Sequence, residues 1–130
     1  MTDILIVDDD PGIQDTLASL FELYGLKSVT ASNGREALKI ISENTPSVIL
    51  LDLMMPVMNG WQFLKEKCAN PNIAGIPVVV MTAGIDEVPA GQAVAILRKP
   101  MAMDDLMAAI NNYVQSQWQL DSKSGAIRRA

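Results

Sequence analysis

Short runs of apolar residues alternate along the chain with segments that have the period of an amphipathic helix. Five runs have the length and the residue types of strands, at residues 4–7, 27–31, 47–51, 77–81 and 93–97. Strands that are apolar throughout are typically buried on both faces, and strands that alternate with helices pair in parallel. The pattern therefore predicts a parallel sheet with helices on both sides.

The first helix has recognisable start and stop signals. Asp10 is a favourable N-cap, Pro11 suits the first helical position, and Gly25 can end the helix. The apolar residues of this segment fall on one helical face, at Ile13, Leu17, Leu20 and Phe21.

Three further helices are predicted from the same spacing. Ser32 can cap the second, whose apolar residues are Ala37, Leu38 and Ile41. A short third helix carries Trp61, Leu64 and Cys68. The last runs from about residue 104 to residue 118, with Leu106, Ile110, Val114 and Trp118 on its inner side. The resulting α/β fold is a doubly wound (βα)₅ sandwich over residues 1–118, and the polar residues 119–130 are interpreted as a disordered tail or the stub of a linker.

Composition narrows the classes of function. The 130 residues suit one domain, 49% of them are hydrophobic, and a net charge of −5 gives no attraction to nucleic acid or anionic lipid. The absence of histidine excludes serine–histidine–aspartate catalysis, histidine zinc sites and a histidine phosphoryl carrier. Cys68 is the one cysteine and has no disulfide partner, and no segment resembles a membrane span or a signal peptide. We expect a cytoplasmic protein that neither binds nucleic acid directly nor inserts into a membrane.

Polar residues follow the predicted strands at the same end. Asp8 and Asp9 follow the first strand and Asp52 the third, while Thr82 and Lys99 follow the fourth and fifth. Each alone has a structural interpretation, as a turn residue, a cap or a surface lysine. The carboxyl ends of parallel strands share one edge, however, and ligands bind at that edge. Their convergence there favours a functional site.

The chemistry of this set points to phosphoryl transfer. Three neighbouring carboxylates repel one another unless a cation is present, and oxygen ligands without histidine or thiolate favour Mg²⁺. A carboxylate can attack phosphorus and form an acyl phosphate, while Mg²⁺, Lys99 and Thr82 hold the phosphoryl oxygens. The residues therefore indicate a magnesium-assisted aspartyl-phosphate site.

At these positions the sequence resembles the receiver domain of two-component response regulators, over about residues 3–118. The matching segments are residues 4–10 (ILIVDDD), 48–60 (VILLDLMMPVMNG), 80–83 (VMTA) and 99–100 (KP). The resemblance implies the flavodoxin-like strand order 2-1-3-4-5.

The resemblance also implies residue roles. Asp52 would accept a phosphoryl group from a histidine kinase or histidine phosphotransfer protein in a phosphorelay, and phosphorylation would switch binding to an unidentified downstream protein. Asp9 and Asp52 would bind the Mg²⁺ cofactor directly, with Asp8 acting through water and Met54 through its backbone carbonyl. Such a domain catalyses only the phosphorylation and dephosphorylation of its own aspartate and is not otherwise an enzyme.

On the other side of the site, Thr82 would bond the phosphoryl group and Lys99 would pair with it. The small residue Ala83 leaves the group room, and the Lys99–Pro100 peptide bond is expected to be cis.

The chain departs from the family pattern in the region before Lys99. Ile96 stands at the switch position where the family often has tyrosine or phenylalanine. In the family, that aromatic ring moves inward when the threonine at the position of Thr82 moves. The stretch from Thr82 to Lys99 is also several residues shorter than usual and contains Pro89 and Gly91. We therefore expect the fourth helix to be shortened or absent.

Two further positions concern the lifetime of the phosphoryl group. Met54 and Gly84 occupy the variable positions that influence hydrolysis in the family, and neither can orient a water molecule. We expect a long-lived aspartyl phosphate. Asn59, in place of the usual aspartate before Gly60, is a milder departure.

Three alternatives stay open. A phosphatase of the haloacid dehalogenase type would need a second aspartate where Met54 stands. A flavodoxin-like flavin binder would need a phosphate-binding first loop, and the three aspartates at residues 8–10 would repel that phosphate. A degenerate receiver would keep the fold as a docking module that works without phosphorylation.

Overall fold

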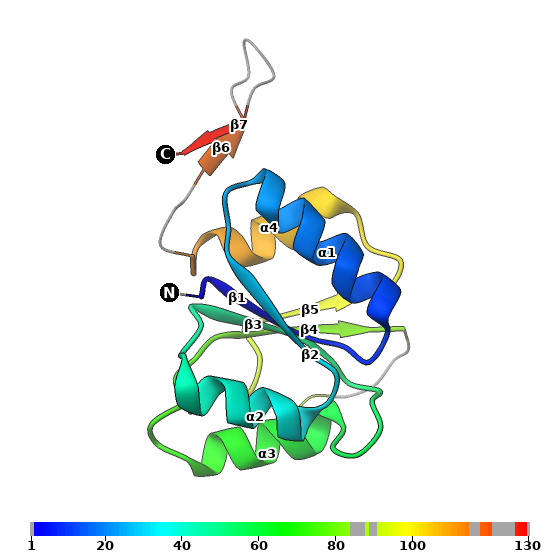
Figure 1. Ribbon diagram of the computed structural model, residues 1–130, viewed down its shortest axis with the longest axis vertical. Helices are drawn as coiled ribbons and strands as arrows, with labels where there is room; N and C mark the ends of the chain where they lie inside the picture. Colours follow the sequence, from blue (N-terminus) through cyan, green and yellow to red (C-terminus); the bar gives the residue numbers. More distant parts are fainter. Residues whose placement is uncertain (1, 84–87, 89–90, 115–117, 121–126, 130) are drawn as a thin grey trace.

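The computed structural model describes residues 2–83, 88, 91–114, 118–120 and 127–129 (Figure 1). Its elements, in chain order, are β1 (Ile4–Val7), α1 (Pro11–Leu23), β2 (Ser28–Ala31), α2 (Gly34–Glu43), β3 (Val48–Asp52), α3 (Gly60–Ala69), β4 (Val78–Thr82), β5 (Ala95–Arg98), α4 (Met103–Asn111), β6 (Trp118–Leu120) and β7 (Ile127–Arg129). Five strands form one parallel sheet in the order β2-β1-β3-β4-β5. The predicted fold class and strand order are confirmed.

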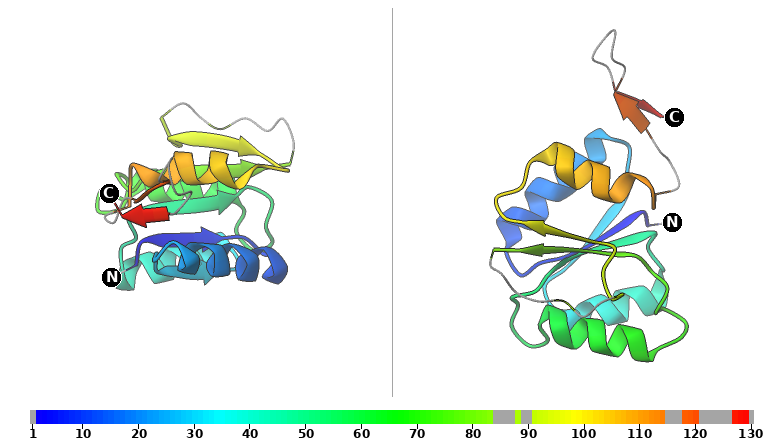
Figure 2. Two further views of the ribbon diagram at one scale, coloured as in Figure 1. Left: turned by 90° about the horizontal axis from the view of Figure 1, so that it is seen from above. Right: turned by 180° about the vertical axis from the view of Figure 1, so that it is seen from behind.

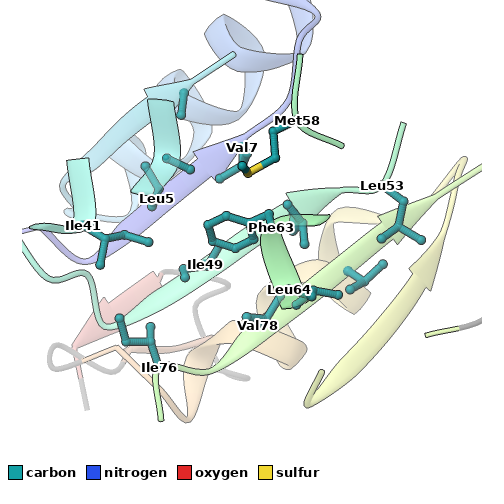
Figure 3. Close-up of a cluster of buried hydrophobic side chains, with 14 residues drawn as sticks. Leu5, Val7, Ile41, Ile49, Leu53, Met58, Phe63, Leu64, Ile76 and Val78 are labelled. Atoms are coloured by element: carbon teal, nitrogen blue, oxygen red, sulfur yellow. The ribbon is translucent and has the colours of Figure 1, made fainter. Parts of the chain in front are cut away.

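Helices cover both faces of the sheet. Helices α1 and α4 lie on one face, and α2 and α3 on the other (Figure 1). The first layer contains an apolar cluster that includes Phe21 and Ile110, and the second a cluster that includes Phe63 and Leu64. In Figure 3, Phe63 and Leu64 lie against Ile49 and Val78 of the sheet. Every residue of β1, β3 and β4 is buried, as expected for strands covered on both sides.

The start of the first helix agrees with its sequence signals, whereas the cap of the second differs. The Asp10 carboxylate accepts hydrogen bonds from the Gly12 and Ile13 amides. The predicted cap Ser32 is wrong, because the Asn33 side chain accepts from the Glu36 amide at 2.8 Å and so caps α2. Serine and asparagine are both favourable caps, so the sequence alone does not show which of these two adjacent residues caps the helix.

The buried face of α3 is rotated from the predicted one. Cys68 is exposed, and the buried residues are Gly60, Phe63, Leu64 and Lys67. They follow the spacing i, i+3, i+4 and i+7, so the true apolar stripe includes a lysine that pattern analysis does not count as apolar. The Lys67 ammonium donates to the Ala74 carbonyl at 2.8 Å.

The last helix ends earlier than predicted. Helix α4 stops at Asn111, and the Tyr113 amide bonds the Ile110 carbonyl at 3.0 Å, which closes the helix in a tighter turn. Trp118 lies in β6, which pairs antiparallel with β7 outside the five-stranded sheet (Figure 2). The described part of segment 119–130 therefore includes these paired strands, and its interpretation as a tail or the stub of a linker stays a prediction.

The connection between β4 and β5 is where the sequence predicts a shortened or absent helix. The described residues there are 83, 88 and 91–94, and none of them is helical. Gly91 has φ of 84°, and the position of Pro89 lies outside the described residues. Within the described chain, no helix has both the length and the apolar character needed to cross a membrane.

Candidate functional site

The carboxyl ends of β1, β3, β4 and β5 lie at the same edge of the sheet (Figure 1). Asp8 directly follows β1, Asp52 ends β3, Thr82 ends β4, and Lys99 directly follows β5. Parallel pairing places these ends together, since Val7 lies opposite Leu51 and Thr82 opposite Arg98. The convergence predicted from the strand ends is therefore present.

The three aspartates form a compact group. One carboxylate oxygen each from Asp8, Asp9 and Asp52 lies within 4.8 Å of the others. Asp8 and Asp52 are buried, whereas Asp9 is exposed. A group with two buried carboxylates requires positive charge nearby, because like charges at this distance repel.

Lys99 supplies part of that charge. Its Nζ lies 3.6 Å from Asp8 Oδ2 and 3.7 Å from Asp52 Oδ2. Its backbone N–H donates to the Thr82 carbonyl at 2.8 Å, and the Lys99–Pro100 peptide bond is cis. The lysine is thus fastened to the end of β4 while its ammonium lies between two carboxylates.

Asp8 is the most deeply buried of the acids. Its Oδ1 accepts from the Asp10 amide at 2.9 Å, whereas its buried Oδ2 accepts no hydrogen bond from the described residues and has the Lys99 ammonium 3.6 Å away. Burial raises the pKa of the Asp8 carboxyl, and the Asp10 hydrogen bond and the charge of Lys99 oppose this rise. A buried carboxylate oxygen without a donor is suited to a cation.

Asp52 is held by the loop that follows it. Its Oδ1 accepts from the Met54 amide at 3.2 Å, and the Met54 side chain is exposed. The donor set of three carboxylates contains only hard oxygen ligands, and one of them, Asp8 Oδ2, is buried and accepts no hydrogen bond from the described residues. These residues fit Mg²⁺ better than a metal that prefers nitrogen or sulfur.

The remaining predicted positions surround this group. Thr82 is buried, and Ala83 follows it as an exposed residue. Ile96 lies on β5 opposite Val80 and is 48% exposed. Gly84 lies outside the described residues.

One polar contact at this edge has no signal in the sequence. The Gln14 side-chain amide donates to the Asp8 backbone carbonyl and to the Ser32 hydroxyl, which is 3.2 Å away. It thereby ties the end of β1 to the segment after β2. Gln14 lies within the amphipathic pattern of α1, and only the orientation of that helix on the sheet brings it to the site.

Comparison with known proteins gives consistent matches. The model of the response regulator receiver domain matches residues 4–111. The chain is 35% identical to the regulatory protein AtoC of Escherichia coli K12, over 96% of this chain and 27% of AtoC. It is 33% identical to the response regulator Rre1 of Synechocystis, over 95% of this chain and 55% of Rre1. It thus spans between about a quarter and about half of these curated relatives.

A solved structure agrees in fold as well as sequence. The crystal structure of a response regulator receiver domain protein from Clostridium thermocellum superimposes with a TM-score of 0.74 at 33% identity. The match covers 87% of this chain and 94% of the other. The similarity therefore extends over nearly the whole of both folds.

Proposed function

The chain belongs to the response regulator receiver domains of two-component signalling, and from this premise we propose that Asp52 is its phosphoacceptor. Receiver domains are signalling domains rather than enzymes that turn over a separate substrate. The donor is a phosphohistidine on a histidine kinase or a histidine phosphotransfer protein. An oxygen of Asp52 forms a bond to phosphorus as the bond between phosphorus and the histidine nitrogen breaks, and the imidazole leaves with the bonding electron pair.

The acidic residues hold the cofactor. Asp9 and Asp52 would hold Mg²⁺ with their carboxylates, Asp8 would act through water, and the Met54 backbone carbonyl would be the remaining protein ligand. When bound, Mg²⁺ supplies positive charge against the negative charge of the phosphoryl oxygens. The buried Asp8 Oδ2, which accepts no hydrogen bond from the described residues, supports this assignment.

Thr82 and Lys99 act on the other side of the phosphoryl group. The Thr82 hydroxyl donates a hydrogen bond to it, and the Lys99 ammonium pairs with its charge. Thr82 and Ile96 form the switch position, and the change at Thr82 passes to β5 without an aromatic ring. The link between the Lys99 amide and the Thr82 carbonyl supports a joint response of the two residues.

Phosphorylation then shifts the population of conformations that bind a downstream protein. It replaces the single negative charge of the Asp52 carboxylate with the charge of a phosphoryl group, about −1.5 to −2. We place this phosphorelay step in the cytoplasm. Because the chain spans only part of its curated relatives, the output of the whole protein is also a proposal.

One observation supports this function above the others. The ammonium of Lys99 lies within 3.7 Å of oxygens from both Asp8 and Asp52, at the edge where parallel strands bind ligands. A purely structural cluster gives no reason to combine two buried carboxylates, a lysine and a buried hydroxyl at that edge.

The test is intact-mass spectrometry after incubation with acetyl phosphate and Mg²⁺. One added phosphoryl group is expected in the native chain, and none without Mg²⁺ or in Asp52→Asn. If the native chain remains unmodified under conditions that label another receiver, the chain is instead a docking module that works without phosphorylation.

A further inference from the structure

A strained turn lies in the loop between Asp52 and helix α3. Val57 has φ of 67°, a left-handed conformation that β-branched residues rarely adopt. The Met58 amide donates to the Pro56 carbonyl at 2.8 Å, so Val57 is the middle residue of a three-residue γ-turn. Its side chain is 76% exposed, so burial of that side chain does not compensate for the strain.

The loop is fastened at its two ends. The Gly60 amide donates to the Leu53 carbonyl at 2.9 Å, and a Cβ atom on Gly60 would lie only 2.6 Å from Leu53 Cα. This contact closes the base of the loop directly beside Asp52. Glycine is required at residue 60 because any side chain would push the two segments apart.

A second fastening point comes from helix α2. The Gly34 amide donates to the Met58 carbonyl at 2.9 Å, and the Met58 side chain is buried in the cluster under α2 and α3. A Cβ atom on Gly34 would lie 2.8 Å from Met58 Cγ and 3.0 Å from its carbonyl oxygen. The first residue of α2 therefore contacts the loop as closely as a glycine permits.

The chain between the two fastening points is short. Residues 54–57 alone connect Leu53 to Met58, and Pro56 among them has a restricted φ. The left-handed turn at Val57 supplies the change of direction that this short connection needs. Met54, at the start of the connection, donates its amide to Asp52 Oδ1, so a shift of Met58 reaches the residue that contacts Asp52.

We propose that Gly34 and Val57 are positioning residues of the Asp52 site. Gly34 holds Met58 in place, the held loop keeps Val57 in its strained turn, and the turn sets the Met54 backbone against the Asp52 carboxylate. Strained residues persist where the surrounding structure fixes a loop for its function. The inference rests on the proposed function, because it assigns both residues to the Mg²⁺ and phosphoryl site.

Four variants distinguish an effect on the position of the loop beside Asp52 from an effect on the overall stability of the fold. Gly34→Ala crowds Met58, and the added Met58→Ala removes the Cγ and Sδ atoms that the new methyl group would meet. Val57→Gly adds no bulk and loosens the turn. Gly75→Ala is the matched control, because a Cβ atom on Gly75 meets no atom within 4 Å.

Two measurements need no phosphoryl donor. The first is the Mg²⁺ dissociation constant, from Trp61 fluorescence in a Trp118→Phe background. The second is hydrogen exchange of the Met54 amide by NMR in metal-free protein. We expect Gly34→Ala and Val57→Gly to bind Mg²⁺ about tenfold more weakly, with faster exchange at Met54. Adding Met58→Ala to Gly34→Ala should restore part of the Mg²⁺ affinity and part of the slow exchange at Met54. Gly75→Ala should match the native chain in both measurements.

Native Mg²⁺ affinity and native Met54 exchange in Gly34→Ala and Val57→Gly would overturn the proposal. Should Gly34→Ala fail to fold, Val57→Gly decides alone. A native chain that is not labelled at Asp52 counts against the proposed function, whereas Met54 exchange in metal-free protein still decides the positioning role.

Discussion

The Lys99 ammonium lies 3.6 Å from Asp8 Oδ2, a buried carboxylate oxygen that accepts no hydrogen bond from the described residues. The same nitrogen lies 3.7 Å from Asp52 Oδ2. Lys99 thus offsets the repulsion between two carboxylates, and it competes with any other cation for the same oxygens.

Lys99→Met tests this double role. Without Mg²⁺, we expect the free energy of unfolding to fall by about 1 kcal/mol, a modest value because the lysine is partly exposed. The affinity for Mg²⁺ should rise about fivefold, since the competing charge is gone. Urea unfolding in EDTA and Mg²⁺ titration measure the two effects. Arg98→Met is the control for the loss of a neighbouring charge, and weaker Mg²⁺ binding in Lys99→Met would contradict the argument.

The lifetime of the aspartyl phosphate depends on groups that can orient water. The exposed Met54 side chain has no strong donor or acceptor, so we expect the modification to persist for minutes or longer in Mg²⁺. Met54→Glu should accelerate hydrolysis about tenfold by positioning water, whereas Met54→Leu should not. The decay of the phosphorylated mass after donor removal measures this. Loss within seconds in the native chain would refute the expectation.

The cap of α2 distinguishes two adjacent residues. Asn33→Ala removes the acceptor of the Glu36 amide and should lower the free energy of unfolding by about 1 kcal/mol. Ser32→Ala removes only the hydroxyl that Gln14 contacts, so its effect should be less than half as large. Chemical denaturation of the two variants beside the native chain gives the comparison, and equal losses would argue against Asn33 as the cap.

Lys67 makes stability depend on alkaline pH. Burial lowers the pKa of its ammonium, so between the folded pKa and the unfolded value near 10.5 the unfolded chain binds more protons. The free energy of unfolding should therefore gain a rising contribution as pH increases through this window. That contribution is at its least favourable below the folded pKa, where both states are protonated.

Lys67→Met is the matched variant, because it keeps the length of the buried side chain and removes the charge. We expect it to lack this alkaline rise and, at pH 7, to lie within about 1 kcal/mol of the native chain. Lys67→Met also loses the hydrogen bond to the carbonyl of the exposed residue Ala74, and this loss limits the stability gained by removing the buried charge. Urea unfolding from pH 7 to pH 10.5 checks this, and parallel curves for both proteins would show that Lys67 titrates normally.

The strands and the edge of the site were predictable because both depend on local pattern. Continuous apolar runs indicate strands buried on two faces, and parallel pairing then brings the residues after them to one edge. Asp8, Asp52 and Lys99 could be placed together in this way before any contact was known. The cap at Asp10 was likewise predictable, because the residues that form it are neighbours along the chain.

Other features could not be predicted from the apolar pattern. Lys67 counts as polar in any pattern, yet it is buried in α3 because the Ala74 carbonyl accepts its ammonium. The last helix ends at Asn111, although the apolar period continues to Trp118.

Sequence by itself therefore determined the fold class and the candidate chemistry, since these follow from side-chain period and strand ends, and the resemblance to receiver domains added the strand order. Tertiary structure alone decided the contact between Gly34 and Met58 and the turn it holds at Val57. In a sequence, glycine indicates only a low helix propensity, and valine indicates an apolar residue that favours strands. Their roles arise from close approach of two segments in space, which no local preference encodes.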